Sequence, residues 1–230
     1  MTAPSKVVFL LDVDNTLLDN DRVERDLRSH LEQAFGPKSE ERYWAIFEEL
    51  RGELGYADYL GALQRYRVEH PRDPHLLNVW SYLLEYPFAD RVYAGALDLV
   101  RRLRRLGRTV ILSDGDVVFQ PRKIMRSGLW DAVDGHVLIY VHKEEMLEDV
   151  GQRYPAERYV MVDDKLRILA AMKQVWGPRL TTVFPRQGHY AMDPKLTAAF
   201  PPADLSVASV ADLLEDDLAS LLATIEAGSR

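Results

Sequence analysis

The stretch Lys6–Leu17, which reads KVVFLLDVDNTL, decides the fold. Its first half is an unbroken apolar and β-branched run, and its second half changes at once to acidic and amide side chains. A short continuous apolar run is typical of a strand that is buried on both faces, as in a parallel sheet. We therefore predict a strand that ends at Leu11 and presents Asp12 and Asp14 at its carboxyl end.

Four more runs of this kind follow, and from Gly95 onward helical patterns alternate with them. The predicted strands are Thr109–Leu112, His136–Val141, Tyr159–Val162 and Leu180–Phe184. Alternation of strands and helices is typical of a parallel sheet whose right-handed crossovers place helices on both faces. The expected fold class is therefore α/β, a three-layer α/β/α Rossmann-like domain.

The stretch between the first two strands is different, because it contains no strand-like run. It is far longer than an ordinary crossover, and Gly and Pro residues divide it into segments. Four helices are predicted there: Asp21–Phe35, Ser39–Leu54, Ala57–Glu69 and His75–Glu85. We predict a helical cap domain over residues 20–87, inserted into a core domain that comprises residues 1–19 and 88–230. After Pro201, one more apolar run and a helix capped by Ser209 are expected.

The composition excludes several classes of protein. The 230 residues are 47% hydrophobic, which is enough for a sizeable core. A net charge of -7 argues against non-specific binding to nucleic acid. Without cysteine there is no disulfide, thiolate nucleophile or Cys-based zinc site. The apolar run Val7–Leu11 is too short for a signal peptide or a membrane span, so we expect a cytoplasmic protein.

Polar side chains gather where the predicted strands end. Ligands of open parallel sheets bind beyond the carboxyl ends of the strands. In chain order, the residues found there are Asp12 and Asp14, Ser113 and Asp114, Lys143, and the pair Asp163-Asp164. We expect these side chains to converge at one edge of the sheet.

The acidic residues of this set suggest phosphoryl transfer. Asp12 and Asp164 offer the hard oxygen ligands that Mg²⁺ prefers, and the cation would let an anionic nucleophile approach an anionic phosphate. Asp12 could then attack phosphorus and form an aspartyl phosphate. Asp14 could protonate the leaving oxygen and later deprotonate the attacking water.

The remaining residues of the set would bind the phosphate. Ser113 and nearby backbone N–H groups would hold phosphoryl oxygens, and Lys143 would balance charge. Asp114 belongs to the phosphate-binding segment by its position. Because its negative charge would oppose the substrate, we expect Asp114, like Asp116, to face away or to cap a helix. Lys123 is an alternative to Lys143, although an exposed lysine is usually only solvated.

Four motifs in this order and spacing resemble the haloacid dehalogenase-like hydrolase superfamily. They are DVDNTL at Asp12–Leu17, LSDG at Leu112–Gly115, Lys143 within VHKEE, and VDD at Val162–Asp164. The resemblance covers essentially the whole chain. It implies the α/β fold, and it implies that the inserted helices form a cap that opens and closes over the site.

The resemblance also implies roles for single residues. Asp12 would be the nucleophile and Asp14 the acid and base, and Mg²⁺ would be bound by Asp12, the main-chain carbonyl of Asp14 and Asp164. Asp163 would stand beside this ligand. Ile168 occupies a position where many members carry another Asp, so which residue of the Asp163-Asp164 pair ligates the metal stays open.

The expected activity is hydrolysis of a phosphate monoester from a small phosphorylated metabolite. Similar dehalogenases lack an acid at the position of Asp14, because halide departs without a proton. A phosphomutase and a non-catalytic binding protein are the alternatives. The candidates for substrate contact in the cap are Tyr56, Arg65 and Arg67. The arginines of residues 101–108 fit the wet face of an amphipathic helix, and the segment Arg186–Tyr190 has no predicted role.

Overall fold

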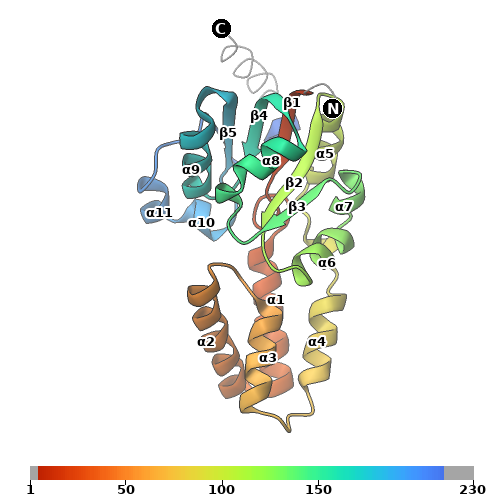
Figure 1. The fold of residues 1–230 in the computed structure, drawn as a ribbon. Coiled ribbons are helices and arrows are strands. Elements are labelled where there is room, and N and C mark those ends of the chain that lie inside the picture. The colour runs from red at the N-terminus through yellow and green to blue at the C-terminus, as the bar shows by residue number, and fades with distance from the viewer. Residues whose placement is uncertain (1–4, 215–230) are drawn as a thin grey trace.

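The computed structural model describes residues 5–214 (Figure 1). Over this range, six strands form one parallel sheet in the order β3-β2-β1-β4-β5-β6. Their bounds are β1 Ser5–Leu11, β2 Arg108–Asp114, β3 Val137–Tyr140, β4 Ala156–Val162, β5 Leu180–Pro185 and β6 Leu205–Val207. All predicted strands are confirmed, with small shifts at their ends, and β6 is the apolar run expected after Pro201.

The central position of β1 explains why its end matters. Leu11 lies opposite Ile111 of β2 and Val162 of β4, so these strands stop at the same edge. Along β1, Phe9 and Leu11 pack into the core on one face of the sheet, and Val8 and Leu10 pack on the other. A strand that is buried on both faces is the expected consequence of its unbroken apolar sequence.

Helices cover both faces and confirm the three-layer fold. Helices α5 (Ala96–Arg104), α6 (Phe119–Arg126) and α7 (Leu129–Ala132) pack on the Phe9 face. Helices α8 (Leu147–Arg153) and α9 (Leu166–Trp176) pack on the Val8 face. Shorter segments complete this part: α10 Gly188–Met192, α11 Pro194–Ala198, and the 3₁₀ helices η1 Phe88–Arg91, η2 Lys143–Glu145, η3 Gly177–Arg179 and η4 Val210–Leu214.

The insertion between β1 and β2 consists of helices, as predicted. They are α1 Asn20–Phe35, α2 Pro37–Leu54, α3 Tyr59–Glu69 and α4 Leu76–Glu85, called the inserted helices below. They form one end of the molecule, below the carboxyl edge of the sheet in Figure 1. Local signals set where they begin: the Asp19 side chain accepts a hydrogen bond from the N–H of Arg22, and Pro37 opens α2.

Aromatic side chains join the inserted helices to the sheet domain. The rings of Tyr59 and Phe119 lie 5.1 Å apart, and those of Phe119 and Phe88 lie 5.7 Å apart. The buried residues of the inserted helices therefore belong to the same apolar cluster as one face of the sheet. The division into two domains at residues 20–87, and the movement of these helices as a cap, stay predictions.

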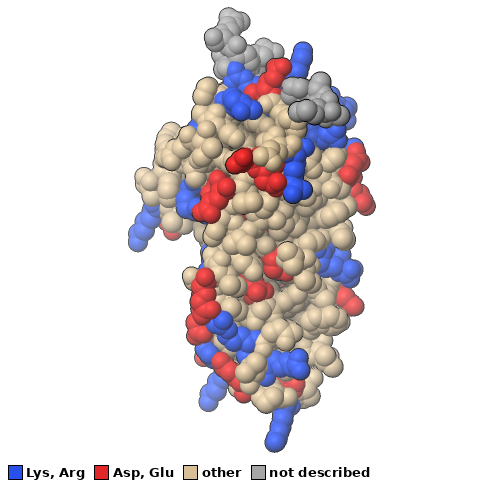
Figure 2. Space-filling view, in the orientation of Figure 1, with Lys and Arg blue, Asp and Glu red and all other residues tan. Residues whose placement is uncertain are grey.

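The surface follows the expected pattern. In α5, Leu99, Val100 and Leu103 are buried while the arginines are exposed, which confirms an amphipathic helix. Acidic and basic side chains are intermixed over the face of the molecule drawn in Figure 2. No helix within residues 5–214 is long and apolar enough to cross a bilayer. The helix predicted after Ser209 starts as η4, and its continuation lies outside the described residues.

Candidate active site

A tight turn after β1 positions the first motif. The backbone N–H groups of Thr16, Leu17 and Leu18 all point to the carbonyl of Val13. Asn15 adopts a left-handed conformation with φ 59°, which asparagine tolerates better than most residues. The hydroxyl of Thr16 accepts a hydrogen bond of 3.0 Å from the N–H of Asp164. This bond ties the first motif to the fourth.

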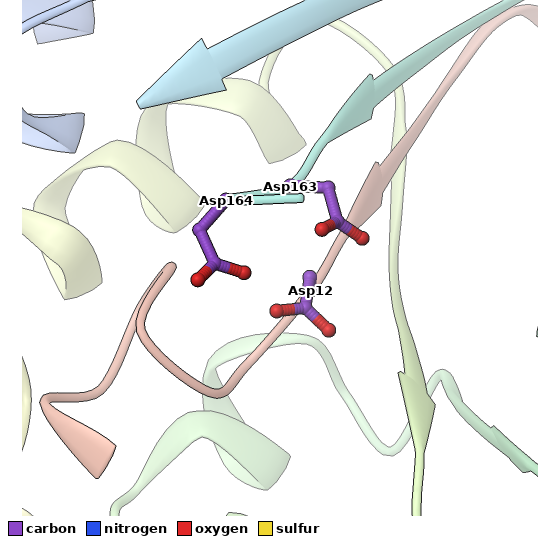
Figure 3. Close-up of side chains that lie close together, drawn as sticks. All are labelled: Asp12, Asp163 and Asp164. Carbon is purple, nitrogen blue, oxygen red and sulfur yellow. The ribbon is translucent and has the colours of Figure 1, made fainter. Parts of the chain in front are cut away.

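Three buried carboxylates meet at this edge of the sheet. Asp12, Asp163 and Asp164 each offer an oxygen, and these oxygens lie within 4.8 Å of one another. Figure 3 shows the three side chains gathered beyond the ends of their strands. Lys143 Nζ donates to Asp12 Oδ1 at 2.5 Å and lies 2.7 Å from Asp163 Oδ2. The Lys143 ammonium group therefore contacts two of the three carboxylates.

The electrostatics of the cluster follow from burial and this imbalance. Burial raises the pKa of Asp163 to about 6 and is opposed by Lys143, while Asp12 adds to the increase. Burial also raises the pKa of Asp164 well above its usual range. Burial would lower the pKa of Lys143, but the negative charges of Asp12, Asp163 and Asp114 outweigh it and raise that pKa. The cluster thus lacks positive charge.

Asp164 is the carboxylate best suited to hold a cation. Both of its carboxylate oxygens are buried and have no hydrogen-bond partner within the described part of the chain. Asp163 is more engaged, because Oδ1 accepts the N–H of Lys165 at 2.8 Å, and Oδ2, although it accepts no hydrogen bond, lies 2.7 Å from the Lys143 ammonium group. Buried charges without partners are costly. A hard cation such as Mg²⁺, which takes oxygen ligands, fits Asp12 and Asp164.

Asp14 lies apart from this cluster and borders the cavity. Its Oδ1 accepts a hydrogen bond of 2.7 Å from Lys123 Nζ, and its Oδ2 accepts one of 3.1 Å from Gln120 Nε2. Lys123 also donates to Asn20 Oδ1 at 2.9 Å. The structure thus separates two acids of one motif: Asp12 faces Lys143, and Asp14 faces Lys123.

Lys123 corrects the sequence interpretation. The sequence leaves Lys123 as an alternative to Lys143 or as a solvated residue, but both lysines are buried at the site and contact different aspartates. The helical spacing of Phe119, Gln120, Lys123 and Ile124 is the signal that could have identified it, because these are the buried residues of α6. A lysine on the buried face of a helix needs a charged partner.

The second motif supplies a hydroxyl and fixes two loops. Ser113 Oγ accepts a hydrogen bond of 2.9 Å from Gln120 Nε2. Asp114 Oδ1 accepts the N–H of Lys143 at 2.8 Å, and burial raises the pKa of this carboxyl. The Asp114 side chain therefore holds the Lys143 loop, and the assignment of Asp114 to the phosphate-binding segment stays a prediction. Asp116 accepts from the N–H groups of Val118 and Phe119 and caps α6, as expected.

A cavity of about 290 Å³ opens between this edge and the inserted helices. Of the three candidates for substrate contact, Tyr56 lines the cavity. Arg65 and Arg67 do not line it, and Arg65 is exposed and doubly bonded to Glu53 at 3.0 and 2.8 Å. Sequence reasoning missed the charged lining residues Glu24, Arg51, Lys165, Arg167 and His189, together with the neutral Asn20 and Tyr190.

The segment Arg186–Tyr190, for which the sequence predicts no role, contributes to the lining of the cavity. The N–H of His189 donates to Asp21 Oδ2 at 2.8 Å, and Asn15 Nδ2 donates to Asp21 Oδ1 at 2.8 Å. Gly188 has φ 69°, and a Cβ atom there would lie 2.4 Å from the Cβ of Asn15. Only a glycine allows this approach without strain. The segment at α10 therefore packs directly on the first motif.

Comparisons with known proteins agree with this geometry. The family model described as haloacid dehalogenase-like hydrolase matches residues 7–175. A crystal structure of a haloacid dehalogenase-like hydrolase from Burkholderia xenovorans LB400 is 67% identical, covers 93% of this chain and 100% of that chain, and has a TM-score of 0.89.

More distant structures share the fold alone. A haloacid dehalogenase-like family hydrolase from Xanthomonas campestris is 19% identical over 98% of this chain and 94% of that chain, with a TM-score of 0.67. The L-2-haloacid dehalogenase from Xanthobacter autotrophicus is 18% identical over 90% and 96%, with a TM-score of 0.57. A search of curated proteins gives no match. The chain belongs to the haloacid dehalogenase-like hydrolase family.

Proposed function

We propose that this hydrolase is a Mg²⁺-dependent phosphatase that acts on a small phosphate monoester through an aspartyl phosphate at Asp12. The observation that supports this most is the separation of the two acids of the first motif. Asp12 lies in the buried cluster against Lys143, whereas Asp14 lines the cavity against Lys123 and Gln120. A nucleophile and a separate proton carrier are what a phosphate ester requires.

In the first step, a carboxylate oxygen of Asp12 forms a bond to phosphorus, and the bond between phosphorus and the leaving oxygen breaks. Asp14 gives its proton to that leaving oxygen. In the second step, Asp14 takes a proton from water, the water oxygen bonds to phosphorus, and the Asp12 carboxylate is released. Phosphate and the free alcohol are the products, and the enzyme returns to its initial state.

The surrounding residues support these steps. Lys143 keeps the Asp12 carboxylate oriented through its contact at 2.5 Å, and Ser113 is proposed to donate to a phosphoryl oxygen. Asp12, Asp164 and the main-chain carbonyl of Asp14 would hold the metal. When bound, Mg²⁺ supplies positive charge that offsets the repulsion between the carboxylates and the phosphate. A cavity of about 290 Å³ suits a small metabolite.

Dehalogenation is the main rival within the family, because the fold is shared with a haloacid dehalogenase. Halide leaves without a proton, so a second acid beside the nucleophile would have no task in that reaction. Asp14 borders the cavity and is held by two partners, which favours phosphate. A phosphomutase would use the same residues and differ only in the acceptor of the phosphoryl group.

The test is an activity panel. Wild type, Asp12→Asn and Asp14→Asn are assayed with p-nitrophenyl phosphate and sugar monophosphates, in Mg²⁺ and in a chelator, and with 2-chloropropionate for halide release. We expect phosphate release that needs Mg²⁺ and is lost in Asp12→Asn. Sugar phosphate isomers among the products would indicate the mutase. The proposal is wrong if wild type releases no phosphate from any ester, or if Asp12→Asn keeps wild-type activity.

A further inference from the structure

The acidic side chains that line the cavity all have partners within the protein. Asp14 is bonded to Lys123, and Asp114 accepts the N–H of Lys143. Glu24 Oε1 accepts hydrogen bonds from Tyr59 Oη at 2.8 Å and from Asn20 Nδ2 at 3.2 Å. The acidic oxygens of the cavity are therefore engaged by donors of the fold, and among these acids Asp14 has a direct ion pair.

Most basic side chains of the lining are paired too. Lys123 faces Asp14, His189 contacts Asp21, and Arg167 Nη1 lies 2.5 Å from Glu144. Lys165 makes no direct ion pair with any residue in the range 5–214, although the negative charges of Asp164, Asp12 and Asp163 lie near enough to raise its pKa. Arg51 has only a weak one, to Glu48 at 3.5 Å on the exposed side of its own helix.

Arg51 and Lys165 approach the same side chain from different elements. Lys165 Nζ lies 4.8 Å from the centre of the Tyr190 ring, and Arg51 Cζ lies 5.9 Å from it. A guanidinium nitrogen of Arg51 also donates to the Tyr190 hydroxyl. Arg51 comes from α2, Lys165 follows β4, and Tyr190 belongs to α10. Two cations thus flank one aromatic ring on the cavity wall.

The end of α2 is fixed so that Arg51 reaches this place. Gly55 ends the helix in a left-handed conformation with φ 82°, and its N–H donates to the Arg51 carbonyl at 3.0 Å. A Cβ atom at Gly55 would lie 2.4 Å from the His142 ring. The last turn of α2 therefore abuts the loop after β3, and its arginine extends toward the sheet domain.

We propose that Arg51 and Lys165 form a subsite for a second anionic group, carried by the alcohol portion of the phosphate monoester. This inference rests on the proposed phosphatase function. Cations that line a cavity and make only weak ion pairs, or no direct ones, attract anionic ligands, and a guanidinium binds carboxylate or phosphate in a directional way. The substrate class is thus a phosphate monoester that also bears a carboxylate or a second phosphate.

Matched pairs of compounds test the subsite. Inhibition constants against p-nitrophenyl phosphate hydrolysis are measured in Mg²⁺ for glycerol 3-phosphate and 3-phosphoglycerate, and for glucose 6-phosphate and glucose 1,6-bisphosphate. The first pair adds a carboxylate and the second adds a phosphate. We expect the more anionic member to bind about tenfold tighter or more in at least one pair, as for a charge-assisted hydrogen bond. Near-equal constants in both pairs overturn the proposal.

Variants show whether Arg51 and Lys165 cause the preference for the more anionic compound of each pair. Arg51→Met and Lys165→Met should each lower the preference for the anionic member about tenfold. Arg65→Met is the matched control, because this exposed arginine pairs with Glu53 away from the cavity, and it should keep the preference. If Arg51→Met weakens both members of each pair equally, Arg51 is only a bridge to Tyr190 and the subsite is wrong.

Failure of the phosphatase proposal would give a different result. If wild type hydrolyses no p-nitrophenyl phosphate, the same four compounds are titrated into the Mg²⁺-loaded protein by calorimetry. A preference for the anionic members that Arg51→Met removes would still support the subsite. Equal affinities within both pairs would overturn it.

Discussion

The acid cluster at the strand ends and the wall of the cavity that Arg51, Lys165 and Tyr190 form are held in place in two different ways. In the cluster, Asp12 and Asp164 each follow the last residues of adjacent strands, and the pairing of Leu11 with Val162 sets them side by side. In the wall, Arg51 contacts Tyr190 across a separation of 139 residues. Strand register determines the first arrangement, and packing of distant elements determines the second.

The two regions also differ in which charged side chains have partners within the protein and which are available to a ligand. In the cluster, Lys143 contacts two of the three carboxylates, and both oxygens of the third, Asp164, have no hydrogen-bond partner in the described residues. In the wall, Arg51 has only the ion pair to Glu48 at 3.5 Å and Lys165 makes no direct ion pair within residues 5–214, so both can attract an anionic ligand. A substrate with an anionic alcohol portion, together with a divalent cation, would satisfy both.

Replacement of Lys143 should have the largest effect on both activity and stability, because it disrupts the acid cluster. Lys143→Met leaves Asp12 and Asp163 buried without their cation. We expect phosphate release to fall by about 10²-fold or more, and the free energy of unfolding to fall by about 3–5 kcal/mol. Activity assays and urea denaturation measure the two effects.

The matched control is Lys173→Met, because Lys173 is partly exposed and pairs with Asp204 outside the cavity. It should change the unfolding free energy by about 1 kcal/mol or less. If Lys143→Met keeps both stability and turnover at the level of this control, Lys143 has no part in the cluster.

The sequence predicted the cluster well because strand ends are local features. An apolar run followed by Asp12 identifies both the strand and its edge, and the same reasoning placed Ser113, Lys143 and Asp164. It did not place Lys123: the helical spacing of its neighbours indicates a buried face, but the packing of α6 decides that this face lies beside Asp14. Arg51 and Tyr190 could not be found either, because no local pattern reports how α2 docks on α10.

Metal binding at different pH values bears on whether Asp163 or Asp164 ligates the metal. In the metal-free protein, burial raises the pKa of Asp163 to about 6, although the positive charge of Lys143 opposes this increase. A raised pKa means that the protonated form stabilises the fold. This contribution is complete below the unfolded value of about 4 and is lost as pH rises through about 6. Mg²⁺ should therefore raise the melting temperature more at about pH 7 than at about pH 5.

Asp164→Asn identifies the ligand. It removes the unpartnered carboxylate, so the Mg²⁺ concentration for half-maximal activity should rise about tenfold or more. The increase of the melting temperature by Mg²⁺ should shrink as well. Asp163→Asn should have the smaller effect on metal affinity, because its Oδ1 mainly holds the N–H of Lys165. The reverse order would show that Asp163 is the direct ligand.

The smallest expected effect concerns the contact between Gly188, the first residue of α10, and Asn15 of the first motif. In Gly188→Ala, the new methyl group would collide with Asn15, and the left-handed conformation would be strained. We expect a loss of about 1–3 kcal/mol in unfolding free energy. Gly177→Ala is the control, because it shares a positive φ but has open space around it. Equal losses in the two variants would mean that the contact with Asn15 costs nothing.

The central claim is that Asp12 carries the phosphoryl group, and it is tested by trapping that group. Asp14→Asn removes the base that activates water, while p-nitrophenyl phosphate has a leaving group that departs without an acid. After acid quenching in the presence of Mg²⁺, mass spectrometry of the peptides should locate one added phosphoryl group on Asp12. A phosphoryl group on another residue such as Ser113, or turnover by Asp14→Asn at the wild-type rate with unmodified Asp12, would contradict the mechanism.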